Sequence, residues 1–178
     1  MERQVRMDLG YNLLLIGFMG TGKTTVATHL QKIYGMNVVD MDQIIEERAG
    51  MSIKEIFDRY GEHAFREKET ELLKQLQEKK NLVISCGGGV VVREENIELM
   101  KQQGKVILLT ATPKTVLERV RDSEARPILN GHKTEAYIEE LMEKRRARYQ
   151  EVADLVISTD GKSAEQIGIE LMEQLEKE

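Results

Sequence analysis

Eight consecutive residues, Gly17 to Thr24, carry the clearest chemical signal in the sequence. They read GFMGTGKT and match the pattern G-x-x-x-x-G-K-[ST]. Glycines in such a loop let backbone N–H groups approach phosphate oxygens, and the following helix adds the partial positive charge of its N-terminus. The lysine reaches the β- and γ-phosphates, and the last hydroxyl holds Mg²⁺. The loop therefore predicts binding of a nucleoside triphosphate.

The surroundings of this loop support the motif. Leu13–Gly17 is a short apolar run typical of a strand, and residues 23–34 carry a helical pattern, so the loop joins a strand to a helix. We expect Lys23 to be catalytic and Thr24 to contribute to a Mg²⁺ site. The candidate ATP-binding residues of the loop are Gly20, Thr21, Gly22, Lys23, Thr24 and Thr25.

The motif alone leaves the use of the triphosphate open, and the rest of the chain narrows it. A GTPase switch would carry a guanine-reading N-K-x-D motif, which the sequence lacks. A motor or helicase would need far more chain than 178 residues. The short length therefore favours a kinase that acts on a small molecule.

Charged residues and glycines follow two further strand candidates. Asp40 and Asp42 close one apolar run, and Gly87–Gly89 follow another. Ligands of open α/β sheets bind at the carboxyl ends of the strands, so these residues are candidates for a site. Each of these signals is weak alone. Asp42 is also a candidate N-cap of a helix, and Gly87–Gly89 could form an ordinary turn. Arg66, in a later helical segment, would by itself be interpreted as a surface residue.

Short apolar runs alternate with longer helical patterns along the chain. Strands are expected at Leu13–Gly17, Asn37–Asp40, Leu82–Ser85, Lys105–Leu109 and Leu155–Ser158. Helix starts are marked by Ser52 with Glu55, by Thr112 before Pro113, and by Ser163 with Gln166. Strands separated by helices imply right-handed crossovers, so the expected fold is α/β: a doubly wound, five-stranded parallel sheet flanked by helices. Residues 1–178 are expected to form a single domain, with an aperiodic loop near 122–133.

Composition excludes several classes of partner. A net charge of -5 argues against broad nucleic-acid binding, and no apolar run is long enough to span a membrane. The single cysteine, Cys86, cannot form an internal disulfide, and the polar N-terminus has no apolar signal core. We therefore expect a cytoplasmic protein that binds neither nucleic acid nor membrane and that acts as a monomer.

Taken together, these elements resemble the shikimate kinase family. The phosphate loop looks like the version found in that family, with methionine and glycine at its third and fourth positions. The further matches are the paired Asp40 and Asp42, the F-R-x-x-E element from Phe65 to Glu69, the triple glycine Gly87–Gly89, the lid motif Arg126–Leu129, and Arg145 four residues before Tyr149. Six elements in the right order cover about residues 13–160. The resemblance implies a P-loop NTPase fold of the nucleoside-monophosphate-kinase type.

The resemblance also implies a reaction and an acceptor site. The family transfers the γ-phosphoryl group of ATP to the 3-hydroxyl of shikimate, giving shikimate 3-phosphate and ADP on the route to chorismate and the aromatic amino acids. Arg66 and Arg145 would pair with the substrate carboxylate, since guanidinium groups match that geometry. Asp42 would accept hydrogen bonds from ring hydroxyls and orient the attacking one or take its proton. The backbone amide of Gly88 would add one donor.

On the ATP side, the resemblance implies that positive charge stabilises the transferred phosphoryl group. Lys23, Mg²⁺ and the lid residue Arg126 would supply that charge, with the lid near residues 122–133 closing over the phosphates. Asp40 would hold Mg²⁺ beside Thr24. Arg119 matches a family arginine that packs near the adenine ring, whereas residues 158–164 lack the proline often found there.

Three alternatives remain at this point. A gluconate kinase on the same scaffold would also need an arginine and an aspartate for a polyol with a carboxylate. A nucleoside monophosphate kinase is disfavoured by the short lid and the lack of a base-reading pattern. A regulatory module without transfer activity is disfavoured by the retention of Lys23, Thr24, Asp40, Asp42 and Arg126.

Overall fold

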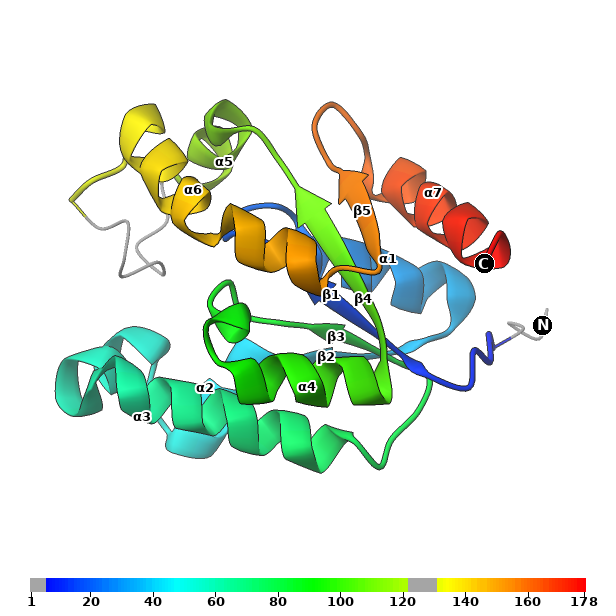
Figure 1. Ribbon diagram of the computed structural model, residues 1–178, viewed down its shortest axis with the longest axis horizontal. Coiled ribbons are helices and arrows are strands. Elements are labelled where there is room, and N and C mark those ends of the chain that lie inside the picture. The colour runs from blue at the N-terminus through cyan, green and yellow to red at the C-terminus, as the bar shows by residue number, and fades with distance from the viewer. Residues whose placement is uncertain (1–5, 122–130) are drawn as a thin grey trace.

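The computed structural model describes residues 6–121 and 131–178. Within these residues five parallel strands form one sheet, in the order β2-β3-β1-β4-β5 (Figure 1). The strands are β1 (Asn12–Ile16), β2 (Asn37–Asp40), β3 (Leu82–Ser85), β4 (Gly104–Thr110) and β5 (Leu155–Ser158). The predicted doubly wound α/β fold is therefore confirmed, and each strand lies where its apolar run predicts.

The central strand β1 explains why its sequence is an unbroken apolar run. Residues Leu13, Leu14, Leu15 and Ile16 are all fully buried. Alternate side chains of a strand point to opposite faces, so Leu13 and Leu15 pack in one core and Leu14 and Ile16 in the other. A parallel sheet covered on both faces needs this continuous apolar pattern.

Helices cover both faces of the sheet. One core includes side chains from α1 (Lys23–Tyr34) and α7 (Ala164–Glu176). The other core packs α2 (Met41–Ala49), α3 (Ile53–Leu76), α4 (Glu94–Gln103), α5 (Pro113–Val120) and α6 (Glu135–Val152). A short 3₁₀ helix, η1 (Val90–Val92), follows the triple glycine. Figure 1 shows α1 and α7 side by side near the C-terminus, and α3 beside α4 on the opposite side of the molecule.

Local capping signals account for most helix starts. The reciprocal hydrogen bonds of a capping box form at Ser52 with Glu55 and at Ser163 with Gln166. Thr112 caps α5, with Pro113 at its first turn.

The expectation that Asp42 caps a helix is wrong, and the start of α4 was not expected. The N-cap of α2 is Asp40, which accepts a hydrogen bond from the backbone N–H of Gln43 at 3.1 Å, so Asp42 lies inside the first turn. Asp42 is thereby released from capping and turned toward the sheet edge. The helix α4 starts at Arg93 without a side-chain cap, and the sequence carries no strong start signal there.

The helix α3 contains a kink. Its backbone is non-helical at Gly61, where φ is 81° and ψ is 170°, so the helix changes direction there. The part beyond this kink carries the F-R-x-x-E element. In the part of the chain that the structure describes, no helix combines the length and apolar character needed to cross a bilayer.

Candidate active site

The phosphate loop is organised by contacts within itself. The Lys23 ammonium donates to the backbone carbonyls of Gly17 and Phe18, at 2.8 and 3.0 Å. The Thr21 hydroxyl also donates to the carbonyl of Phe18, at 2.8 Å. Gly22, with φ of 99°, precedes the first residue of α1 in a conformation that L side chains rarely adopt. The loop thus places its lysine and backbone N–H groups around the N-terminus of α1. This arrangement is typical of sites that bind the phosphate groups of a nucleotide.

A small group of oxygen ligands lies beside the loop at the end of β2 and β3. The Thr24 hydroxyl lies 3.1 Å from Oδ2 of Asp40 and 3.5 Å from Oγ of Ser85. Hydroxyl and carboxylate oxygens are the hard ligands that Mg²⁺ prefers, and one carboxylate leaves most positions to water and phosphate. The donor set therefore fits Mg²⁺ bound together with a nucleotide. Among the described residues there is no cluster of three or more His, Cys, Asp or Glu side chains that would bind a metal unaided.

Arg119 joins the phosphate loop to the segment after β5. Its guanidinium donates to the carbonyl of Gly20 at 3.0 Å and to the hydroxyl of Thr159 at 3.1 Å. Thr159 is fully buried, and its hydroxyl lies 2.9 Å from the carbonyl of Thr21. Sequence reasoning placed Arg119 near the nucleotide but missed Thr159, because a lone threonine after a strand has no distinctive pattern.

Side chains from three helices converge on the triple glycine that follows β3. A Cβ placed on Gly87 would lie 2.8 Å from Oε1 of Glu69 and 3.0 Å from Oδ1 of Asp42. One placed on Gly88 would lie 3.6 Å from Nη1 of Arg145. Because the residues come from α2, α3 and α6, the fold brings together groups that are distant in sequence.

The third glycine lies directly against the other arginine. A Cβ on Gly89 would lie 2.2 Å from Nη2 and 2.4 Å from Cζ of Arg66, closer than any real contact. The backbone of Gly89 is not strained, with φ of -101°, so the glycine is required by this close approach and not by its own conformation. The guanidinium of Arg66 therefore packs flat against a surface that only glycine leaves open.

Arg66 is held in the core by two carboxylates on its own helix. Its side chain is 7% exposed, and Nη1 donates to Oε2 of Glu69 at 2.8 Å while Nη2 donates to Oε1 of Glu62 at 3.1 Å. Burial alone would lower the pKa of the guanidinium, but the charge of Glu69 and the hydrogen bonds to both carboxylates raise it. Arg66 is thus a fixed cation with its orientation set by i,i+3 and i,i+4 partners.

Glu69 is a functional candidate that residue types alone did not assign. Its side chain is fully buried, and burial raises the pKa of its carboxyl to about 7. The positive charge of Arg66 opposes this shift, whereas the negative charge of Asp42 acts with it. The sequence places Glu69 in the F-R-x-x-E element, and the i,i+3 spacing from Arg66 is the signal that could have identified the pair.

Two further buried side chains lie next to the triple glycine. Tyr149 is buried, and its hydroxyl donates to the backbone carbonyl of Gly88, which joins α6 to the triple glycine. Burial raises the pKa of this phenol, so it remains a neutral donor. Cys86 is buried as well, and burial raises the pKa of its thiol, as expected for a packing residue.

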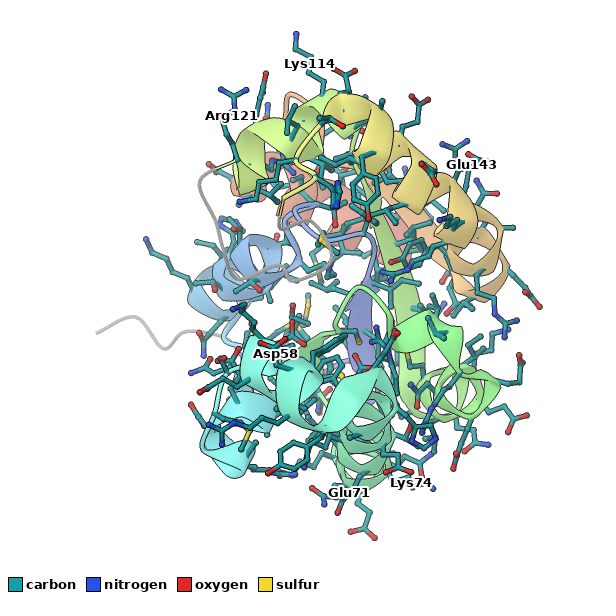
Figure 2. The ribbon with its side chains drawn as sticks, turned by 90° about the vertical axis from the view of Figure 1, so that its left-hand side faces the viewer. Asp58, Glu71, Lys74, Lys114, Arg121 and Glu143 are labelled. Carbon is teal, nitrogen blue, oxygen red and sulfur yellow. The ribbon has the colours of Figure 1, made fainter. Side chains whose placement is uncertain are left out.

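A cavity of ≈ 240 Å³ lies between the phosphate loop and the first two glycines of the triple glycine. Its lining includes Lys23, Thr24, Asp40, Asp42, Ser85 and Gly88. Figure 2 shows the labelled Lys114 and Arg121 at the α5 end of the molecule and Glu71, on α3, at the opposite end. The carboxyl ends of the strands lie between these ends, so a ligand there would be reached by residues from both sides.

The basic residues between positions 119 and 148 differ in what the structure shows of them. Arg126 lies outside the described residues, together with most of the loop near 122–133. Several other basic residues between 119 and 148 form exposed ion pairs: Lys144 with Glu140, Arg146 with Glu143, and Arg148 with Glu94 and Glu151. These pairs agree with a solvated helix face and leave Arg145 as the arginine of α6 that lies against the triple glycine.

Comparisons with known proteins agree with this arrangement. The family model for shikimate kinase matches residues 19–176. The shikimate kinase of Thermodesulfovibrio yellowstonii is 41% identical over 166 residues, which cover 93% of this chain and 95% of that protein. The solved structure of a shikimate kinase from Acinetobacter baumannii in complex with shikimate superposes with a TM-score of 0.89 at 34% identity, covering 94% of this chain and 93% of that one.

A more distant likeness bears on the gluconate alternative. A gluconokinase from Sinorhizobium meliloti superposes with a TM-score of 0.59 at 13% identity, over 96% of this chain and 94% of that one. Similarity at this level shows a shared fold and carries no information about the acceptor.

Proposed function

Because this chain belongs to the shikimate kinase family, we propose that its site is divided into an ATP half and a shikimate half that meet at the triple glycine. The chain is an ATP-dependent kinase that transfers the γ-phosphoryl group of ATP to the 3-hydroxyl of shikimate, giving shikimate 3-phosphate and ADP. The observation that carries the residue assignments is the convergence of Asp42, Arg66 and Arg145 on Gly87–Gly89.

Shikimate binds through its carboxylate and its hydroxyls. Arg66 and Arg145 pair with the carboxylate, because both guanidinium groups lie against adjacent glycines of one turn. The backbone N–H of Gly88 donates to the substrate. Asp42 accepts from ring hydroxyls and orients the 3-hydroxyl for attack, with its proton passing to the carboxylate as the new O–P bond forms. The solved relative with shikimate bound supports this acceptor.

The ATP half positions the leaving group. Lys23 and the backbone N–H groups of Gly20–Thr25 bind the phosphates, and Lys23 stabilises charge on the transferred phosphoryl group. Arg119 orders the loop through its bond to Gly20 and lies near the nucleotide base. Arg126, which belongs to the predicted lid, adds positive charge and excludes water once both substrates are bound.

Thr24 and Asp40 are the residues that would hold Mg²⁺. When bound with ATP, this ion neutralises charge on the β- and γ-phosphates.

An ADP-release assay with a panel of hydroxy acids tests the function. We expect turnover with shikimate and none above background with gluconate. Turnover with gluconate at a comparable kcat/KM would refute the assignment, as would ATP binding without a phosphorylated product.

The variant Arg66→Ala tests the acceptor half. Loss of a charge-assisted contact should raise KM for shikimate about thirtyfold, equivalent to about 2 kcal/mol, and leave KM for ATP unchanged. Arg59→Ala is the matched control, because Arg59 is exposed on the same helix. An unchanged KM for shikimate in Arg66→Ala would remove this residue from the site.

A further inference from the structure

Two buried polar side chains connect the helix that carries Arg66 to the backbone beyond the triple glycine. Thr70 on α3 is 5% exposed and Asn96 on α4 is fully buried. The Thr70 hydroxyl lies 2.6 Å from Oδ1 of Asn96, and Nδ2 of Asn96 donates to the carbonyl of Val90 at 3.0 Å. The chain of contacts therefore runs from α3 through α4 to the first residue of η1.

Both ends of this chain lie next to acceptor-binding groups. Thr70 is one helical turn beyond Arg66, and its hydroxyl lies 3.1 Å from the Arg66 carbonyl. Val90 follows Gly89 directly, and its N–H donates to the carbonyl of Gly87 at 3.1 Å. The contacts thus set the spacing between α3 and the turn that holds the three glycines.

That spacing decides where the Arg66 guanidinium can lie. The guanidinium packs against Gly89 with no room for even a methyl group between them. A shift of α3 relative to η1 by a fraction of an ångström would change this contact and tilt the guanidinium away from the acceptor carboxylate.

We propose that Thr70 and Asn96 are positioning residues for acceptor binding, an inference that rests on the proposed role of Arg66. They do not touch the substrate. They fix the distance between the helix that carries the carboxylate-binding arginine and the glycine turn on which that arginine packs. A fully bonded buried pair of this kind specifies one arrangement, whereas an apolar contact would allow sliding.

The same two helices provide an internal control at the other end of the sheet. Gln103 on α4 is buried and donates to the carbonyls of Leu73 on α3 and Leu99, at 3.4 and 3.1 Å. It also accepts from Nδ2 of Asn12 at 3.2 Å, at the start of β1. This network joins α3 to α4 as well, but it lies at the amino end of the strands, away from the glycine turn.

The test compares steady-state constants for both substrates in four variants. Thr70→Val keeps the shape and removes the hydroxyl, and it should raise KM for shikimate about fivefold with KM for ATP within about twofold of wild type. Thr70→Ser keeps the hydroxyl and should restore KM for shikimate to about the wild-type value. Gln103→Leu should lower the unfolding midpoint in urea without changing either KM.

The double variant Thr70→Val/Asn96→Leu distinguishes a positioning role from the effect of leaving one buried polar side chain without its hydrogen bond. It leaves no unpaired polar atom on either side chain of the pair, although it also removes the partner of the Val90 carbonyl and an acceptor of Arg93. Urea unfolding therefore checks its folding beside that of Thr70→Val. KM for shikimate should remain raised in it, because the polar connection is still absent. A wild-type KM for shikimate in the folded double variant would overturn the proposal.

Other outcomes are equally decisive. The proposal fails if Thr70→Val leaves KM for shikimate unchanged, if both KM values rise together, or if Gln103→Leu raises KM for shikimate as much as Thr70→Val does. Arg66→Ala, measured alongside, keeps the two hypotheses apart. A raised KM in Arg66→Ala with no change in Thr70→Val refutes only the positioning role, whereas no change in Arg66→Ala refutes the acceptor site itself.

Discussion

The phosphate loop and the side chains gathered around Gly87–Gly89 are assembled in opposite ways. The loop is eight consecutive residues, and its lysine is held by bonds within the loop, such as the 2.8 Å bond from Lys23 to the carbonyl of Gly17. The side chains around the glycine turn after β3 come from three helices: Asp42 from α2, Arg66 and Glu69 from α3, and Arg145 from α6.

This difference assigns phosphoryl transfer and acceptor selection to separate groups of residues in the proposed site. Nucleotide binding depends on a local backbone shape that the loop sequence specifies by itself. In the proposed site, acceptor binding depends on how α2, α3 and α6 pack around Gly87–Gly89. Changes to the loop should therefore affect turnover, and changes around the glycine turn should affect KM for shikimate.

The largest effect is expected at Lys23. Lys23→Ala removes a cation that stabilises the transferred phosphoryl group, and it should lower kcat roughly 10³-fold while KM for shikimate changes little. Single-turnover rates of ADP formation measure this directly. Lys32→Ala, an exposed change in the last turn of the same helix, is the control. A comparable rise in KM for shikimate would show that the two regions are not separable.

A smaller effect is expected from a single methyl group in the pocket. Gly89→Ala leaves the backbone unstrained but places a Cβ 2.2 Å from Nη2 of Arg66. The guanidinium must move, although Glu62 and Glu69 hold it, so KM for shikimate should rise about tenfold and KM for ATP should stay constant.

The double variant Gly89→Ala/Arg66→Ala sharpens this prediction. With Arg66 already shortened, the added methyl group should have little further effect on KM for shikimate. Independent, multiplicative effects of the two changes would show that Gly89 acts through something other than Arg66.

The smallest effect concerns stability and pH. The pKa of Glu69 is about 7 in the folded protein, against an ordinary value of 4.5. The folded state therefore keeps a proton that the unfolded chain releases, and stability from this group is lost as pH rises from about 4.5 through about 7. The value of about 7 already includes the opposing charge of Arg66, so the loss of stability should be at most about 3 kcal/mol.

Urea unfolding at several pH values between 5 and 8 measures this dependence. Glu69→Gln has no carboxyl to titrate, so its stability should fall less than that of the wild type across this range. Parallel curves for the two proteins would contradict the shifted pKa. No comparable difference is expected for Glu67→Gln, since Glu67 is exposed on the same helix.

Sequence patterns predicted the regular elements well where a local cause exists. Capping boxes at Ser52 and Ser163 mark real helix starts because the side chain and its backbone partner are three residues apart. Asp42 was misread as a cap because Asp40, two residues earlier, makes that bond instead. The start of α4 was missed because Arg93 offers no cap.

The candidate site was predictable in parts. Motif spacing pointed to Lys23, Asp42, Arg66 and Arg145, and the fold brings all four to one edge of the sheet. The bond from Tyr149 to the Gly88 carbonyl joins residues 61 positions apart, and no local pattern reports such a contact. Thr159 escaped notice for the same reason, since its hydroxyl reaches Thr21, 138 positions away.

The sequence by itself determined the triphosphate loop and the succession of strands and helices along the chain, because each follows from neighbours within a few positions. Only the tertiary structure decided that Glu69 is buried with its pKa raised. It also decided that the guanidinium of Arg66 leaves no room for a side chain at Gly89, and that Thr70 contacts Asn96. Burial, close packing and long-range hydrogen bonds arise when separate elements come together, so their consequences depend on the assembled core.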